Sequence, residues 1–129
     1  MRETVRTERA PLPVGAYSQA VISGRLVFTA GQIGIDPGKG TLVTGARAQT
    51  AQALENIANV LREAGSGLDW VIRMNLYITD MADFEVINGV YSSVFSEPYP
   101  ARSVVEVAAL PLGAVIEMEA VAEVGRGST

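Results

Sequence analysis

An arginine stands at the start of a β-forming run in the stretch YPARSVVEV, residues 99–107. The guanidinium of Arg102 presents a planar fork of donors, which can bind a carboxylate through two parallel hydrogen bonds. A lone arginine in a strand is more often solvated or paired with an acidic side chain. Glu106 and Glu119 are available as such structural partners. The residues alone therefore leave a carboxylate-binding arginine and a surface arginine as two interpretations.

Two carboxylates lie near the end of the chain, in VIEMEAVA, residues 115–122. Glu117 and Glu119 are two residues apart, so in a strand their side chains point to the same side of the sheet. A carboxylate beside a water molecule can accept a proton during hydrolysis. An exposed strand carboxylate has only a surface role, and the spacing does not choose between the two glutamates.

The chain contains no histidine and no cysteine, which limits its chemistry. It lacks the usual general base and the usual metal ligand, and it forms no disulfide, zinc–thiolate site or thiol nucleophile. Ten basic and fourteen acidic residues give a net charge of −4. Nucleic acid is therefore not expected as a partner, because phosphate neutralisation supplies most of that affinity.

Length and hydropathy indicate a single globular domain. The chain has 129 residues, 48% of them hydrophobic, and a mean hydropathy of +0.23, which suffices for one buried core. No apolar run approaches the roughly 20 residues that cross a bilayer. The N-terminal MRETVRTERAP lacks the apolar centre of a signal peptide, so we expect a cytoplasmic protein without a membrane partner.

Two strands and a helix are predicted in the first half of the chain. Residues 17–30 form a hairpin that turns at Ser23 and Gly24, and residues 35–41 form a loop rich in Asp, Pro and Gly. The helix begins near Thr44, an N-cap residue type, and ends at Gly65, a C′ residue type. Its apolar side repeats at helical spacing in Leu54, Ile57, Val60, Leu61 and Ala64.

A strand, a second helix and two further strands are predicted after residue 68. Residues 69–79 alternate, and the side expected to pack under the helices carries Trp70, Ile72, Met74, Leu76 and Ile78. Asp80 can cap a helix that ends before Pro98. The last strands cover residues 102–109 and 114–124, and an extra strand at 2–6 would extend the sheet.

This order of elements predicts an α+β fold with a mixed sheet of about six strands and both helices on one face. Alternation leads us to place Arg102, Val104 and Glu106 on the helix-free face, together with Glu117 and Glu119. Charges interleaved with valines fit either a solvated face or a partly polar subunit interface.

Six segments of the sequence closely resemble the Rid family of reactive-intermediate deaminases, formerly called the YjgF family. They are APLPVGAYSQA (10–20), FTAGQI (28–33), QTAQALENI (49–57), NLYITDMADF (75–84), YPARSVVEVAALP (99–111) and VIEMEAVA (115–122). The likeness runs in order over residues 3–124, so we expect one domain over 1–124 and a flexible tail at 125–129. The resemblance implies a chorismate-mutase-like fold and a homotrimer with a site in each of its three subunit clefts.

The resemblance also implies a reaction and roles for two residues. Characterised members hydrolyse short 2-imino and 2-enamino acids (2-aminoacrylate, 2-iminopropionate, 2-iminobutanoate) to 2-oxo acids and ammonia, with no cofactor or metal. Arg102 matches the arginine that binds the substrate carboxylate. Glu117 matches the glutamate that holds and polarises the attacking water.

Further site residues follow from the same resemblance. Tyr17 matches an aromatic residue of the pocket, Gly31 a backbone contact to the ligand, and Asn88 a residue near the site. Val104 stands in the pocket where many members carry cysteine, and Ala30 stands where serine is usual. These two departures bear on substrate preference and turnover more than on the class of reaction.

The residues and the family resemblance together suggest four candidate functions. The first is the hydrolytic deaminase. The second is a trimer that binds a small 2-oxo or 2-imino acid as a sensor without useful turnover, and the third is a pathway-specific deaminase that acts on a larger substrate. A ribonuclease of the kind reported for some relatives is disfavoured by the net charge of −4 and the lack of histidine.

Overall fold

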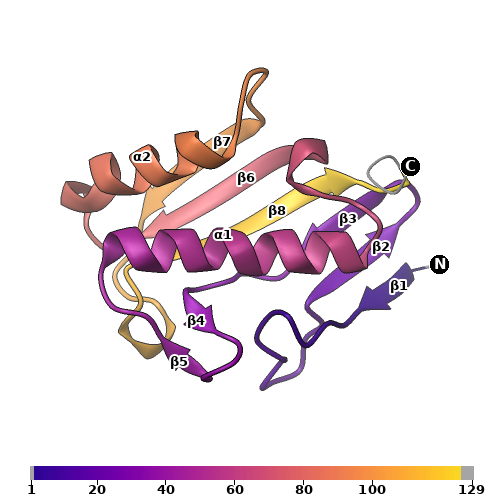
Figure 1. The fold of residues 1–129 in the computed structure, drawn as a ribbon, viewed down its shortest axis with the longest axis horizontal. Helices are drawn as coiled ribbons and strands as arrows, with labels where there is room; N and C mark the ends of the chain where they lie inside the picture. The colour runs from indigo at the N-terminus through magenta and orange to yellow at the C-terminus, as the bar shows by residue number, and fades with distance from the viewer. Residues whose placement is uncertain (1, 126–129) are drawn as a thin grey trace.

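A six-stranded mixed sheet with two helices on one face makes up the computed structural model, which describes residues 2–125 (Figure 1). The strand order is β1-β2-β3-β8-β6-β7. In chain order the strands are β1 (Arg2–Val5), β2 (Ala20–Ser23), β3 (Leu26–Thr29), β6 (Val71–Ile78), β7 (Ala101–Glu106) and β8 (Ile116–Glu123). The predicted α+β class and the extra N-terminal strand are confirmed. The tail predicted at 125–129 lies outside the described residues except for Gly125.

The predicted hairpin forms, whereas the loop predicted after it contains two short strands. Strands β2 and β3 pair around Gly24, whose φ of 61° lies in the left-handed region that favours glycine. The loop predicted at 35–41 instead contains two short paired strands, β4 (Ile35–Asp36) and β5 (Thr41–Leu42). Asp36 Oδ1 accepts a hydrogen bond from the Gly38 N–H at 2.8 Å and shapes the turn between them.

Helix α1 (Ala46–Glu63) packs across the sheet and supplies much of the core. Leu54, Ile57 and Leu61 are at most 2% exposed, as the helical spacing predicts. The helix gives way to Gly65 at φ 80°, which confirms the predicted C-terminal signal. The predicted Thr44 cap is wrong: the N-cap is Gly45, with no side-chain hydrogen bond.

Strand β6 departs from strict alternation at its start. Met74, Leu76 and Ile78 are fully buried as predicted, but Ile72 is 43% exposed and Val71 is buried in its place. The register with β8 shifts between Val71 and Arg73. This β-bulge adds one residue and reverses the side on which the first residues of the strand point.

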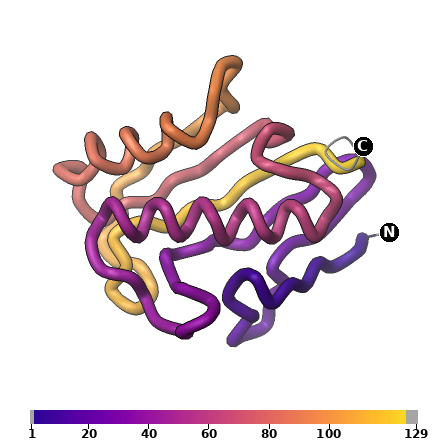
Figure 2. Tube along the Cα trace, viewed as in Figure 1, coloured from indigo at the N-terminus to yellow at the C-terminus, as the bar shows by residue number. Residues whose placement is uncertain are grey.

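Helix α2 (Phe84–Val94) provides the crossover that makes β6 and β7 parallel, a path that is easily followed in the tube of Figure 2. Asp80 Oδ1 accepts a hydrogen bond from the Ala82 N–H at 2.9 Å. It thereby caps the short 3-10 turn Met81–Asp83 that leads into the helix. Ile87, Tyr91 and Phe95 bury their side chains against the sheet.

The face assigned to Arg102 from the sequence is wrong. In the parallel pairing Arg102 lies beside Met74, and Val104 lies beside Leu76. Paired residues of neighbouring strands point to the same side of the sheet, so Arg102 and Val104 lie on the helix-covered face. Strand β7 is an edge strand with valines on both sides, so its hydrophobic pattern does not show which side chains face the helices. The register of its parallel pairing with β6 decides this.

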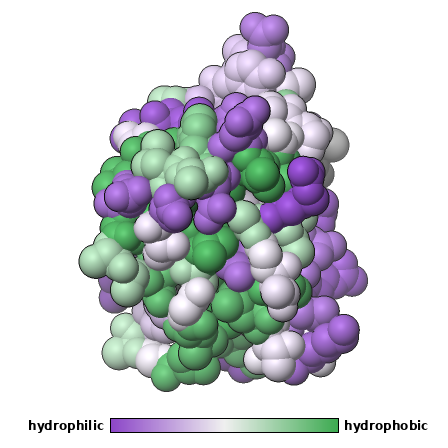
Figure 3. Space-filling model, turned by 90° about the vertical axis from the view of Figure 1, so that its left-hand side faces the viewer, coloured by the Kyte–Doolittle hydropathy of each residue, from purple (hydrophilic) through white to green (hydrophobic). Residues whose placement is uncertain are grey.

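The helix-free face carries charges mixed with exposed apolar side chains. Phe28 and Val105 are 44% and 47% exposed there. They share this face with Arg73, Asn75, Tyr77, Ser103, Glu117 and Glu119. The loop from β7 to β8 contains a further 3-10 turn, Pro111–Gly113, in which Leu112 is 73% exposed at a φ of 58°. Figure 3 looks onto the end of the molecule at the left of Figure 1 and shows apolar side chains among polar ones there, most densely in the lower part of the view.

Within the described residues, neither helix is long and apolar enough to span a membrane.

Candidate active site

Arg102 lies at the outer edge of the sheet, between β7 and helix α2. Its Nη1 donates a hydrogen bond to Asn88 Oδ1 at 2.7 Å. Its Cζ lies 4.8 Å from the centre of the Tyr91 ring and 5.6 Å from that of Phe84, both within the range of a cation–π contact. The structure thus brings together two of the predicted site residues, Arg102 and Asn88.

An open cavity of about 460 Å³ adjoins this arginine. Its lining combines one cation with amide, hydroxyl and aromatic groups, contributed by Asn88, Tyr91, Ser92, Tyr99, Pro100 and Arg102. Arg102 keeps most of its five N–H donors available because Asn88 takes only one of them. Such a cavity can hold a small anion that carries an apolar part.

The acidic residues that the sequence offers as partners of Arg102 are engaged elsewhere. Glu106 Oε1 accepts a hydrogen bond from the Met81 N–H at 2.8 Å. Glu119 Oε2 accepts hydrogen bonds from the Tyr77 hydroxyl at 3.0 Å and from Asn75 Nδ2 at 3.1 Å. The interpretation of Arg102 as a structural ion-pair residue therefore loses its two candidate partners.

Glu117 lies on the opposite face of the sheet from Arg102. On β8 it pairs with Tyr77, whereas Arg102 pairs with Met74, the opposite side of the pleat. The pKa of the Glu117 carboxyl is raised above its usual value, chiefly because burial disfavours its charged form and also because the charge of Glu119 lies nearby. A carboxylate with a raised pKa is a better proton acceptor.

Gly31 makes room for the Glu117 side chain. A Cβ atom at position 31 would overlap the Glu117 carboxylate, so only glycine permits this approach. The backbone on either side is fixed: Gln32 donates to the Met118 carbonyl at 2.7 Å, and Ala30 donates to the Gln19 carbonyl at 2.8 Å. Gly31 and Glu117 therefore form a second, separate group of predicted site residues.

Of the remaining two predicted residues, Tyr17 lies apart from both groups and Val104 lies beside Arg102. Tyr17 is 51% exposed and lines another cavity, of about 420 Å³, with Leu12, Val14 and Ile35 among its neighbours. Val104 lies two residues beyond Arg102 on the same face, where it is half-buried and packs against the core.

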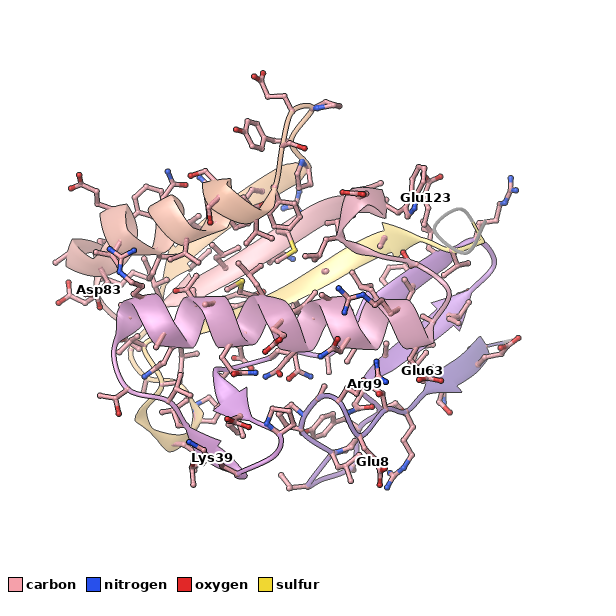
Figure 4. All side chains as sticks on the ribbon, in the orientation of Figure 1. Glu8, Arg9, Lys39, Glu63, Asp83 and Glu123 are labelled. Atoms are coloured by element: carbon pink, nitrogen blue, oxygen red, sulfur yellow. The ribbon has the colours of Figure 1, made fainter. Side chains whose placement is uncertain are left out.

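A third cavity is lined by polar and charged residues, some of which bind one another. It lies where the N-terminal segment meets the end of α1 and includes Arg9 and Glu63, both labelled in Figure 4. Arg62 donates to Asn59 Oδ1 at 2.7 Å, and Asn59 Nδ2 donates to the Arg9 carbonyl at 2.9 Å. Among the described residues no group of three His, Cys, Asp or Glu side chains could hold a metal ion.

Two contacts of the site do not follow from the sequence pattern. Helical spacing places Tyr91 in the apolar stripe of the second helix, but its ring also lies against Arg102. Alternation places Tyr77 on the helix-free face without a partner, and its hydroxyl binds Glu119. The signal for the first contact is present, because Phe84, Asn88 and Tyr91 recur at intervals of four and three residues and so share one helix face.

Residues 7–124 match the family model described as Endoribonuclease L-PSP. A RutC family protein of Pyrococcus abyssi is 48% identical over 94% of this chain and 96% of its own length. The human 2-iminobutanoate/2-iminopropanoate deaminase is 42% identical over 95% of this chain and 90% of its own.

Solved structures agree with these matches. RidA from an Antarctic Psychrobacter species has a TM-score of 0.92 at 45% identity, covering 95% of this chain and 99% of its own. TdcF of E. coli with bound serine has a TM-score of 0.90 at 40% identity, covering 94% and 98%. Fold and sequence agree over nearly the whole chain, and the chain belongs to the Rid family, whose family model is described as Endoribonuclease L-PSP.

Proposed function

We propose that this protein is a cofactor-free hydrolytic deaminase that converts short 2-imino and 2-enamino acids to 2-oxo acids and ammonia. The observation that carries the proposal is Arg102, which Asn88 holds through one donor beside an open cavity. The rat and human relatives, each 42% identical, are named 2-iminobutanoate/2-iminopropanoate deaminase. We therefore take 2-iminopropionate, 2-iminobutanoate and 2-aminoacrylate as substrates.

The reaction needs two protein groups. Arg102 binds the substrate carboxylate through paired hydrogen bonds, and Glu117 holds a water molecule and accepts one of its protons as the oxygen attacks C2 of the protonated imine. Glu117 then passes the proton to the amine of the resulting carbinolamine, and the C2–N bond breaks to release ammonia. The C2 hydroxyl gives its proton back to Glu117 as the carbonyl forms, and the departing ammonia carries that proton away as ammonium. An enamine enters the same route after protonation at C3. Holding water and imine in place supplies much of the rate gain.

The two groups can meet on one substrate only between subunits. Arg102 and Glu117 lie on opposite faces of the sheet within one chain, so we propose a homotrimer in which one subunit presents Arg102, Asn88 and Val104 and its neighbour presents Gly31 and Glu117. Tyr17, half-exposed on its loop, closes the cleft. The exposed Phe28 and Val105 of the helix-free face support burial of that face in an assembly.

A sensor that binds without useful turnover is the second candidate. It is favoured by Ala30 and Val104, which leave the site without the usual hydroxyl and thiol, and by a TdcF relative whose structure carries bound serine. In this case the same cleft holds a small amino or 2-oxo acid and releases it unchanged. Deaminase and sensor differ in ammonia release, not in the ligand.

The test is the substitution Arg102→Ala, assayed with 2-iminopropionate generated in situ by an amino-acid oxidase. Loss of the bidentate ion pair in the cleft is expected to lower kcat/KM by about a hundredfold or more. The matched control is Arg62→Ala, which removes an exposed arginine of α1. Retention of full activity by Arg102→Ala would exclude the assignment. Ligand binding without faster ammonia release by the unmodified protein would favour the sensor.

A further inference from the structure

Three side chains of α2 surround the Arg102 guanidinium on its helix side. Asn88 holds one nitrogen through the 2.7 Å hydrogen bond, while the rings of Tyr91 and Phe84 lie 4.8 Å and 5.6 Å from Cζ. The hydrogen bond fixes a single atom and leaves the guanidinium free to rotate about it. A ring face fixes the remaining freedom, because a cation over an aromatic face is attracted most strongly to its centre.

Tyr91 is the closer and the more rigid of the two rings. It is 3% exposed, against a half-buried Phe84, and it packs on Phe95 with ring centres 4.6 Å apart. A residue held on several sides can position another, since its own rotamer is fixed by packing. Tyr91 also lines the cavity beside Arg102.

The hydroxyl of Tyr91 does not account for its place there. It is buried and has no hydrogen-bond partner among the described residues, although buried hydroxyl groups are nearly always bonded. A hydroxyl without a partner adds nothing favourable to the fold. What Tyr91 contributes to the cavity is therefore its ring.

We propose that Tyr91 is a positioning residue for substrate binding: the face of its ring orients the Arg102 guanidinium so that two N–H groups point toward the substrate carboxylate. This inference rests on the proposed function, and it adds a residue that acts through Arg102 without contact with the reacting atoms. Without the ring, Arg102 samples more orientations, and the carboxylate must select the productive one at a cost in affinity.

The experiment compares two substitutions of Tyr91 in the assembled protein. Tyr91→Leu removes the ring and is expected to raise KM for 2-iminopropionate about tenfold, with kcat changed less than about threefold. Tyr91→Phe keeps the ring and removes only the unpartnered hydroxyl, so KM is expected to stay within about twofold of the unmodified protein. The dissociation constant of 2-oxobutanoate, measured by calorimetry, is expected to follow KM.

Ile87→Ala is the matched control, because it removes a fully buried core side chain from the same helix. It is expected to lower thermal stability as much as Tyr91→Leu while leaving KM near its original value. If Tyr91→Leu does not fold, Tyr91→Met, which fills more of the volume without a ring, is expected to show the same rise in KM.

Three outcomes would overturn the inference: an unchanged KM in folded Tyr91→Leu, a Tyr91→Phe variant as weak as Tyr91→Leu, or an equal rise in KM for Ile87→Ala. Arg102→Ala, measured in parallel, shows whether only the positioning role of Tyr91 fails or the proposed function fails as well. If Arg102→Ala loses binding and Tyr91→Leu does not, only the positioning role fails. If Arg102→Ala binds and turns over normally, the proposed carboxylate site fails and the positioning role fails with it.

Discussion

At the scale of single residues, the proposed mechanism makes activity depend on the charge state of Glu117. Burial and the neighbouring Glu119 both raise the pKa of Glu117. The deprotonated form is the one that accepts a proton from water, so activity should rise with pH through this raised pKa. The acidic limb of the pH profile therefore belongs to Glu117 in the proposed mechanism.

Glu119→Gln is expected to move that acidic limb to lower pH. The substitution removes one of the two causes that raise the pKa of Glu117, so Glu117 ionises more readily. The amide oxygen of the substituted side chain can still accept the hydrogen bonds from Tyr77 and Asn75. A pH profile of kcat/KM checks this, with Glu55→Gln on the exposed side of α1 as control. A limb that stays in place or moves upward would contradict the prediction.

The raised pKa also has a consequence for stability, and its sign follows from linkage. When the folded-state pKa of a carboxyl group exceeds its unfolded value, the folded state binds the proton more tightly. Stability is then greatest below the unfolded pKa and falls as pH rises through the window up to the folded pKa. Glu117→Gln is therefore expected to raise the melting temperature at pH 7 and to have little effect near pH 4. An equal shift at both pH values would show that charge is not the cause.

A substitution at Gly31 probes the position of the Glu117 carboxylate rather than its charge. In Gly31→Ala the added methyl group overlaps the Glu117 carboxylate and must displace it. We expect kcat to fall by about tenfold or more, because a water held even slightly out of place reacts much more slowly. Gly24→Ala is not a suitable control, since Gly24 has a φ of 61°. Gly89→Ala is suitable, and unchanged kcat in Gly31→Ala would argue against a role for Glu117.

At the scale of the elements, helix α2 connects β6 to β7, covers part of the sheet and carries residues of the candidate site. Gly89 is exposed in its middle, and a Cβ there would meet no atom within 4 Å. Gly89→Ala is therefore expected to stabilise the protein by about 0.5–1 kcal/mol, since alanine loses less backbone freedom on helix formation. Urea denaturation measures this, and a loss of stability would show that the neighbouring subunit occupies the space.

The elements also show how far the sequence could predict the fold. Leu54, Ile57 and Leu61 and the glycines at 24 and 65 predict their elements correctly, because helical spacing and left-handed turns depend on neighbouring residues. The bulge before Arg73 and the face of Arg102 could not be predicted in this way. Both depend on the pairing of strands far apart in the sequence, which local patterns do not encode.

The candidate site likewise contains residues that could be predicted from the sequence and contacts that could not. Arg102 and Glu117 could be singled out from residue type and family resemblance. The ring of Tyr91 against Arg102 and the Tyr77 hydroxyl on Glu119 required the assembled sheet and helix. Spacing placed Tyr91 on the buried stripe of its helix, and a buried stripe is ordinarily explained by packing alone.

At the scale of the whole molecule, the helix-free face should control assembly. Phe28 is 44% exposed on β3, opposite the helices. Phe28→Asp is expected to convert the proposed trimer to monomers, since an unpaired charge in an apolar interface is costly. Activity should be lost while the monomer stays folded, as checked by light scattering and circular dichroism. An active Phe28→Asp monomer would disprove sites between subunits.

Because Arg102 and Glu117 lie on opposite faces of the sheet, two inactive variants of this protein should complement each other when they are expressed together. Chains with Arg102→Ala and chains with Glu117→Ala are each expected to be inactive alone. In mixed trimers some clefts pair an intact arginine from one chain with an intact glutamate from the other, so random mixing should restore about a quarter of the original activity. No recovery on co-expression would show that one chain supplies both groups. Two null alleles that complement each other would be the genetic signature of a reaction centre that no single polypeptide contains.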